Sequence, residues 1–361
     1  MLEIYGILLL GLVVYLNTPK FGHLPDKISR YKINRSSHQK HWHFANLHNT
    51  PKMTGKGGFW RVMFDFYFGS HPHTKPSQNI PAHKINWSEW NRRDNITVWF
   101  GHSSYLIRLH QKNYLIDPVF SANASPLPHN VVPFLGTNLY HTEDLPDIDY
   151  LIITHDHWDH LDYPTVKKLQ PKVKKVITGL GVGSHFRHWG YNHDKIIEMD
   201  WNESINIDNI QINCLPARHF SGRSIFANRT LWASFLIISK DYKFYIGGDS
   251  GYDNHYKIIN QKFGPLDIAF LEAGQYDRNW RYIHSMPEET IQAAVDLQTH
   301  NLFPVHNSKF SICNHPWYEP LQKIYELSPQ SAFKLLTPQI GEIVELQNDR
   351  QTFSAWWKGI K

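Results

Sequence analysis

The sequence predicts a layered α/β sandwich in which functional side chains project from the ends of strands. Two observations carry this prediction. From Ile96 onward, short apolar segments alternate with turns, and segments with helical signals separate some of them. A dense group of histidine and aspartate residues follows one apolar segment directly, and single residues of the same kinds follow later ones.

Ten segments have the length and apolar character of strands. They are residues 96–100, 105–109, 114–116, 150–154, 175–178, 210–215, 231–239, 243–246, 268–271 and 302–305. Helices are expected over residues 164–170 and 287–299, and the second of these opens with Pro-Glu-Glu, as the first turn of a helix often does. Strands and helices in this order favour packed layers.

The first 94 residues differ from this pattern. Residues 1–18 form an apolar segment with the character of a membrane anchor or a signal peptide, and residues 19–94 are rich in His, Asn, Lys, Pro and aromatic side chains without sustained periodicity. We therefore expect three parts: the apolar segment 1–18, an irregular extension 19–94 packed on the core, and the sandwich over residues 95–361.

The apolar stretch 4–16 is shorter than the roughly 20 residues that a helix needs to cross a bilayer. Only Glu3 is charged before it, no small-residue cleavage site follows it, and several basic residues lie shortly after it. We interpret it as an uncleaved anchor that leaves the protein at a membrane with its body in the cytoplasm. The alternatives are a signal peptide, which would place the protein in the periplasm or outside the cell, and an ordinary buried helix.

Composition narrows the possible partners. The 24 histidines raise the expectation of a metal site, and the net charge of +5 suits an anionic partner such as a phospholipid headgroup. The basic residues are scattered without a basic block, so we expect no nucleic-acid partner. Two cysteines are too few for a disulfide framework.

The densest cluster of polar residues follows the strand predicted over residues 150–154. It comprises His155, His157, Asp159 and His160. Residues two apart in an extended chain point the same way, so His155 and His157 can converge on one cation. Imidazole and carboxylate ligands suit zinc at about 2.0–2.2 Å, and the density of ligands allows two adjacent ions. An accidental match to this run is expected on the order of once in a hundred such chains or less.

Three further residues occupy comparable positions. His219, Asp249 and His306 each follow a predicted strand by a few residues. Any one of them, taken alone, would more often be an ordinary polar residue. Together with the cluster they become candidate ligands.

These residues and several surrounding segments resemble a known family. The H-x-H-x-D-H run, the later His, Asp and His, and Asp117 in Leu115-Ile116-Asp117-Pro118 resemble the metallo-β-lactamase superfamily. More narrowly, residues 17–25, 99–104, 116–121, 216–223, 230–232 and 284–289 resemble the N-acyl-phosphatidylethanolamine-hydrolysing phospholipase D family and its bacterial relatives. The resemblance extends over roughly residues 17–325.

The resemblance implies a four-layer αββα sandwich with two zinc ions per chain. One zinc would be held by His155, His157 and His219, and the second by Asp159, His160 and His306. Asp249 would bridge them, and Asp159 and Asp249 would serve catalysis.

Further residues have implied supporting roles. Asp117 and Asp162 are candidates for orienting the ligating imidazoles, although Asp162 could instead cap the helix that follows it. His284 and His102 are the candidate substrate contacts. One segment departs from the family: the animal enzymes have Trp-Gly-Thr-Phe after the last metal histidine, whereas Asn307-Ser308-Lys309-Phe310 follows His306. The ligand is retained and the pocket is altered.

The implied activity is zinc-dependent hydrolysis of a glycerophospholipid phosphodiester at a membrane surface. The nucleophile would be a hydroxide shared by the two metals. The protein could form a homodimer. Two alternatives stay open. A lactonase or small-ester or phosphoester hydrolase uses the same fold, because fold does not fix the substrate. A membrane-tethered, non-catalytic binding protein is the other, although a complete ligand set argues against it.

Overall fold

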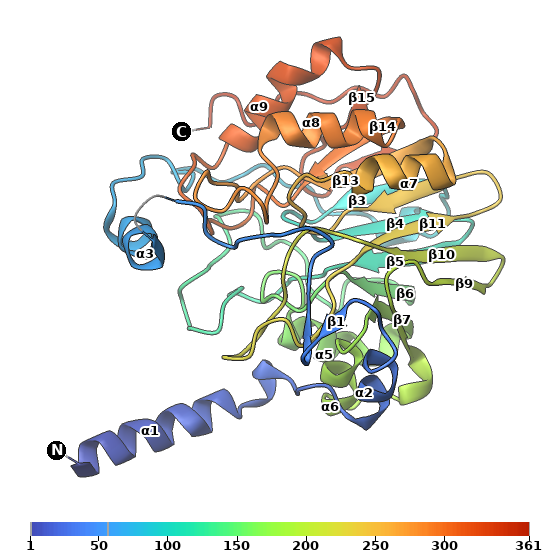
Figure 1. The fold of residues 1–361 in the computed structure, drawn as a ribbon. Helices are drawn as coiled ribbons and strands as arrows, with labels where there is room; N and C mark the ends of the chain where they lie inside the picture. The colour runs from blue at the N-terminus through green and yellow to red at the C-terminus, as the bar shows by residue number, and fades with distance from the viewer. Residues whose placement is uncertain (1, 56–57, 361) are drawn as a thin grey trace.

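The computed structural model describes residues 2–55 and 58–360. Two seven-stranded mixed sheets lie face to face at its centre, and helices cover the outer face of each (Figure 1). The four layers confirm the sandwich that the sequence predicts.

The first sheet has the strand order β16-β3-β4-β5-β6-β7-β8. Its strands run antiparallel from β16 to β5 and parallel from β5 to β8. They are β3 (Ile96–Trp99), β4 (Tyr105–Leu109), β5 (Lys112–Ile116), β6 (Ile148–Ile153), β7 (Val173–Gly179), β8 (Ile196–Met199) and β16 (Ile343–Glu345).

The second sheet has the order β15-β14-β13-β12-β11-β10-β9 and repeats this plan, with an antiparallel half up to β12 and a parallel half from β12 to β15. Its strands are β9 (Ser204–Ile207), β10 (Ile210–Leu215), β11 (Ser234–Ile238), β12 (Lys243–Ile246), β13 (Leu266–Glu272), β14 (Thr299–Val305) and β15 (Lys334–Leu335). The carboxyl ends of its parallel strands share one edge.

Helices form the two outer layers. The first sheet is covered by α5 (Tyr163–Leu169) and α6 (Gly183–His188), and the second by α7 (His255–Phe263), α8 (Pro287–Asp296) and α9 (Glu319–Leu327). Short 3₁₀ turns are η1 (Pro19–Phe21), η2 (Gln170–Lys172), η3 (His193–Lys195) and η4 (Ser328–Gln330).

The main core lies between the two sheets. The rings of Tyr105 and Phe270, one from each sheet, stack with centroids 4.3 Å apart. All six residues of β6 are buried, because this strand faces the second sheet on one side and the helices on the other. Burial on both faces explains why such strands read as continuous apolar runs in the sequence.

All ten predicted strands and both predicted helices are present, with differences of a few residues at their ends. Four strands of the two seven-stranded sheets lack a sequence signal: β8, β9, β15 and β16. All four are the outermost strands of a sheet, and β9 alternates exposed and half-buried residues. Short, partly exposed outer strands carry little of the apolar signal on which the prediction depends.

The segment before Ile96 contains more regular structure than expected. It includes α1 (Leu2–Leu16), α2 (Lys27–Ile33), α3 (Gly58–Phe68), α4 (Trp87–Trp90) and the hairpin of β1 (Gln39–Lys40) and β2 (His43–Phe44). Helix α2 packs on the body through two contacts. Its Ser29 donates to the carboxylate of Glu198, and its N-cap residue Asp26 pairs with Arg187 of α6. The division of the chain into three parts stays a prediction.

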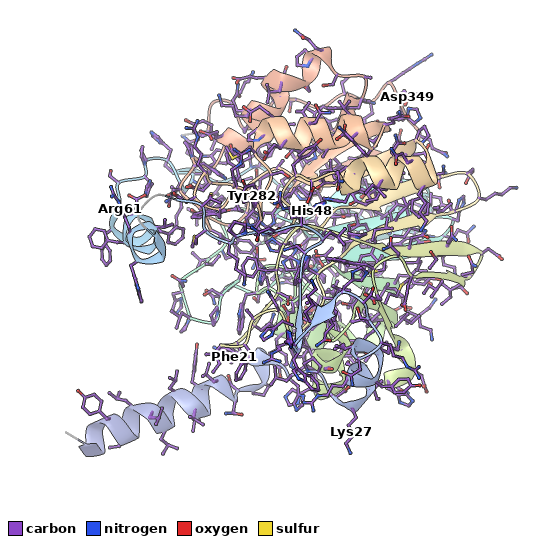
Figure 2. The ribbon with its side chains drawn as sticks, viewed as in Figure 1. Phe21, Lys27, His48, Arg61, Tyr282 and Asp349 are labelled. Atoms are coloured by element: carbon purple, nitrogen blue, oxygen red, sulfur yellow. The ribbon has the colours of Figure 1, made fainter. Side chains whose placement is uncertain are left out.

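Helix α1 projects away from the body (Figure 1), and its apolar side chains from Tyr5 to Val14 are exposed. Its carboxyl-terminal end is attached to the body: Tyr15 donates to the carbonyl of Pro126, and Lys20 Nζ, shortly after the helix, reaches the same oxygen at 2.8 Å. Phe21, at the junction between α1 and the body in Figure 2, is buried and packs edge-on against Trp158 at 5.1 Å.

Among the residues that the structure describes, no helix combines the length and the apolar character required to cross a membrane.

Candidate metal centre

The seven candidate ligands lie together at one edge of the sandwich. They come from the loops that follow β6, β10, β12 and β14, so both sheets contribute. Backbone hydrogen bonds join the two sheets here, since His306 N donates to His102 O at 3.0 Å and His102 N donates to Asn307 O at 2.9 Å. The sandwich therefore fixes side chains that are up to 151 positions apart in the chain.

Three imidazole nitrogens converge in a first cluster. His157 Nδ1 lies 2.9 Å from His155 Nε2 and 3.2 Å from His219 Nε2. Asp249 Oδ2 lies 3.8 Å from His155 Nε2 and 3.6 Å from His219 Nε2. A tetrahedral ion with bonds of 2.0–2.1 Å separates its ligand atoms by roughly 3.3 Å, so these spacings fit one cation.

A second cluster lies on the other side of Asp249. His160 Nε2 is 3.5 Å from Asp159 Oδ2 and 3.2 Å from Asp249 Oδ1. His306 Nδ1 lies 2.9 Å from the same Asp249 oxygen. The Asp249 carboxylate thus directs one oxygen toward each cluster, in the position that a bridging ligand requires.

Burial and unsatisfied atoms support a fit to metal cations. His160 Nε2 and Asp249 Oδ1 are buried, and among the described residues their close contacts do not have the geometry of a hydrogen bond, which is costly for polar atoms. Burial, together with the neighbouring histidines, holds the pKa values of His155 and His219 well below the ordinary value. Their imidazoles are therefore neutral and present lone pairs, as metal ligands must.

His160 shows the opposite shift. Burial lowers its pKa, but the carboxylates of Asp249, Asp159 and Asp117 outweigh burial and raise the pKa well above the ordinary value. Three carboxylates around one imidazole, those of Asp117 and Asp249 fully buried, indicate a site with a deficit of positive charge. Divalent cations would supply that charge.

Asp117 orients two of the candidate ligands. Its Oδ2 lies 2.8 Å from His160 Nδ1, and its Oδ1 accepts from Thr154 N at 2.9 Å. Thr154 Oγ1 also donates to Asp117 and lies 3.0 Å from His155 Nδ1. Such bonds fix the tautomer of an imidazole and leave its other nitrogen for the metal.

Asp162 and His102 do not make the contacts that were expected from the sequence. Asp162 accepts hydrogen bonds from Ser121 and Thr165 and, within the described residues, bonds to none of the seven candidate ligands. It occupies the N-cap position of α5 without a side-chain bond to the helix backbone. Its carboxylate instead joins this helix to the loop after β5.

His102 was expected to contact substrate, but it is completely buried and does not line the pocket. Its Nε2 lies 2.9 Å from Asp159 Oδ2. Burial, the charge of His306 and other neighbours lower its pKa to about 3, so its imidazole is neutral. The geometry makes His102 a support for Asp159 or an additional nitrogen donor in the second cluster.

Sequence reasoning missed Glu272, the last residue of β13. Its Oε2 lies 2.8 Å from His284 Nδ1, and its Oε1 accepts from Ser285 N at 2.6 Å. The ring of His284 lies 5.0 Å from that of His219 and 5.3 Å from that of His306. The rule that found Asp249, a carboxylate at the end of a strand, applies equally to Glu272.

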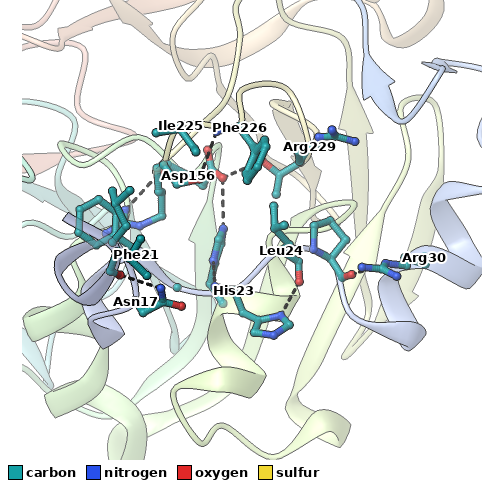
Figure 3. A pocket seen from close by; sticks show the side chains of 17 residues that line it. Asn17, Phe21, His23, Leu24, Arg30, Asp156, Ile225, Phe226 and Arg229 are labelled. Atoms are coloured by element: carbon teal, nitrogen blue, oxygen red, sulfur yellow. Dashed lines mark hydrogen bonds and ion pairs between the residues drawn. The ribbon is translucent and has the colours of Figure 1, made fainter. Parts of the chain in front are cut away.

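Asp156 belongs to neither cluster and instead lines a separate pocket together with residues such as Phe21 and His23 (Figure 3). It accepts from Gly222 N at 2.7 Å and from Thr230 Oγ1 at 2.8 Å, and it pairs with His185 at 3.2 Å. Burial raises its pKa, but these partners lower it to about 2. Arg223 donates both to the Asp156 carbonyl and to Lys20 O, so the segment after α1 is tied to this loop.

A pocket of about 600 Å³ opens onto both clusters. At the metal end it is lined by His157, Asp159, His219, Asp249, His284 and His306. Most of the remaining wall is apolar: Met53, Phe66, Ala124, Pro126, Val131, Trp158, Phe220, Trp280, Ile283 and Ile312. The pocket can therefore hold a sizeable apolar group next to the candidate metals.

Comparisons with known proteins agree with this geometry. A beta-lactamase superfamily domain matches residues 112–307, more than half of the chain. An uncharacterized protein of Mycobacterium tuberculosis is 34% identical over 319 residues, covering 87% of this chain and 86% of that protein. N-acyl-phosphatidylethanolamine-hydrolyzing phospholipase D 1 of Caenorhabditis elegans is 30% identical over 269 residues, covering 69% of this chain and 74% of that enzyme.

A solved structure shows the same fold. The isothiocyanate hydrolase from Delia radicum gut bacteria superposes with a TM-score of 0.55 at 21% identity, covering 72% of this chain and all of that one. The chain belongs to the metallo-β-lactamase superfamily. It is a metal-dependent hydrolase. The alternative of a non-catalytic binding protein is therefore wrong.

Replacing Asp117 with Asn should weaken metal binding by about 10- to 100-fold, because the carboxylate that orients His160 is lost. Competition with a chromophoric chelator measures this affinity. The matched control is Asp162→Asn, another buried carboxylate, which should leave the affinity unchanged. Equal losses in the two variants, or no loss for Asp117→Asn, would contradict the orienting role.

Proposed function

We propose that this protein is a zinc-dependent phosphodiesterase that hydrolyses a glycerophospholipid in the manner of an N-acyl-phosphatidylethanolamine phospholipase D. The observation that carries the proposal is the pocket: about 600 Å³ of space with a largely apolar wall opens onto two adjacent clusters of metal-ligand type. The similarity to the Caenorhabditis elegans phospholipase D over most of the chain supports the same substrate class.

The proposed ligand sets follow the two clusters. His155, His157 and His219 would hold one zinc, Asp159, His160 and His306 would hold the other, and Asp249 would contribute one oxygen to each. Two zinc ions bound there would supply Lewis acidity and lower the pKa of an attacking water toward about 7.

Side chains of the protein would transfer the proton, orient the substrate and exclude water. Asp249 and Asp159 are placed to accept or relay the proton of the attacking water, since both line the pocket beside the clusters. Glu272 holds Nδ1 of His284, which directs the other ring nitrogen toward substrate oxygens near the scissile bond. The apolar wall excludes bulk water from the reacting groups.

The surface beside the pocket supports membrane association. The apolar side chains of α1 from Tyr5 to Val14 are exposed, and so are the Phe64 and Phe68 rings of α3, a second helix on the same side of the molecule (Figure 1). Pro126, which accepts the hydrogen bond of Tyr15 from α1, also lines the pocket, and the neighbouring Leu127 is exposed. We propose that α1 lies in the membrane interface and keeps the pocket entrance close to lipid.

Hydrolysis of a small neutral ester or a lactone is the second candidate. Apart from the metal end, the pocket wall contains few polar groups, which suits a neutral substrate as well as an acyl chain. The same metal-activated water would attack a carbonyl carbon. Substrate assays separate the two candidates.

The zinc-loaded protein should release phosphatidic acid from N-acyl-phosphatidylethanolamine in mixed micelles, as measured by mass spectrometry. Asp249→Asn should reduce this release by about 10²-fold or more, because charge stabilisation in the transition state is lost. Lactones and short neutral esters are the parallel substrates. Their turnover without any release of phosphatidic acid would reject the phospholipase assignment and favour the second candidate.

Replacing Leu8 and Leu12 of α1 together with Glu should lower the fraction of protein that floats with phospholipid vesicles, by about tenfold or more in affinity, because two apolar side chains leave the interface. Turnover of a water-soluble substrate should not change. Ile258→Glu is the control, because Ile258 is similarly exposed on α7 on another side of the molecule. Unchanged flotation of the α1 variant would show that α1 makes no membrane contact.

A further inference from the structure

Lys52 is the only lysine or arginine among the described residues that line the pocket. Its Nζ lies 4.0 Å from the centre of the Phe220 ring. That ring in turn packs against His157 at 4.5 Å and against His219 at 4.8 Å. A single aromatic ring therefore separates the ammonium from the first cluster of candidate ligands.

No carboxylate neutralises this ammonium within the described part of the chain. The side chain is half-buried, and burial lowers the pKa of Lys52 without an opposing acidic neighbour. Contact with the face of an aromatic ring restores only part of the hydration that a buried cation loses. The pocket thus contains one positive charge without a counterion.

The backbone on both sides of Lys52 is fixed to the core. Arg218 donates to the Asn49 carbonyl at 2.9 Å and to Thr50 Oγ1 at 3.0 Å. On the other side, Thr54 N donates to the Asn279 carbonyl at 2.6 Å. The base of the side chain is therefore held in place. Its flexible four-carbon stem allows the ammonium to leave Phe220 and turn toward a substrate bound at the metal end of the pocket.

We propose that Lys52 selects anionic substrates by binding the charged phosphoryl oxygens of a phosphodiester at the metal centre. This rests on the proposed phosphodiesterase function and deepens it. A phosphodiester and its phosphomonoester product both carry negative charge, whereas a neutral ester or a lactone carries none. Lys52 therefore discriminates between the two candidate substrate classes.

The experiment uses the full-length, zinc-loaded protein and inorganic phosphate as the anionic probe. Isothermal titration calorimetry should show that Lys52→Gln binds phosphate about tenfold more weakly than the wild type, because a charge-assisted hydrogen bond is lost. Lys52→Arg should retain most of the affinity. Lys262→Gln is the matched control, since Lys262 also lies over an aromatic ring, Phe263 at 5.1 Å, but on α7 outside the pocket.

Kinetics provide the second measurement. Lys52→Gln should lower kcat/KM for bis(p-nitrophenyl) phosphate by about tenfold and leave that for p-nitrophenyl butyrate unchanged. Unchanged phosphate affinity in Lys52→Gln would overturn the proposal, and so would equal losses on the two substrates, which a structural role predicts. Because phosphate binding requires no turnover, failure of the phosphodiesterase function itself would be recognised separately, as a wild type that binds phosphate and cleaves no phosphodiester.

Discussion

The centre depends on one carboxylate, that of Asp249, which directs an oxygen toward each of two histidine clusters. Four anchored loops from two sheets must meet around it, and the pairing of His102 with His306 and Asn307 joins those sheets at this edge. Buried imidazoles with lowered pKa values on one side, and three carboxylates around His160 on the other, are costly unless cations compensate them. The fold therefore assembles a site whose electrostatics are completed by metal.

Backbone strain is concentrated at the same edge. His102, Asp117 and His306 have φ values of 54°, 39° and 66°, in the left-handed region that side chains other than glycine seldom occupy. Each such residue costs on the order of 1–3 kcal/mol, which the packing between the two sheets offsets. The left-handed conformation turns the chain sharply after a strand, so that the side chain of the strained residue faces the metal centre.

The sequence predicted the sandwich and the seven clustered residues because both depend on local patterns: apolar runs buried on two faces, and polar residues just after them. Glu272 obeys the same rule, because it directly follows the strand predicted to end at Leu271, yet it was not singled out. The placement of His102 behind Asp159 and of Lys52 over Phe220 could not be read from the sequence. Both depend on contacts between distant segments, and nothing near Lys52 in the chain marks it as part of a pocket.

Anomalous diffraction from crystals of the zinc-loaded protein, measured on both sides of the zinc absorption edge, tests the account most directly. A two-metal centre predicts two zinc peaks per chain. One peak should lie among His155, His157 and His219, and the other beside His160 and Asp159, with Asp249 between the two peaks. A single peak, or zinc bound away from Asp249, would contradict the two-metal centre.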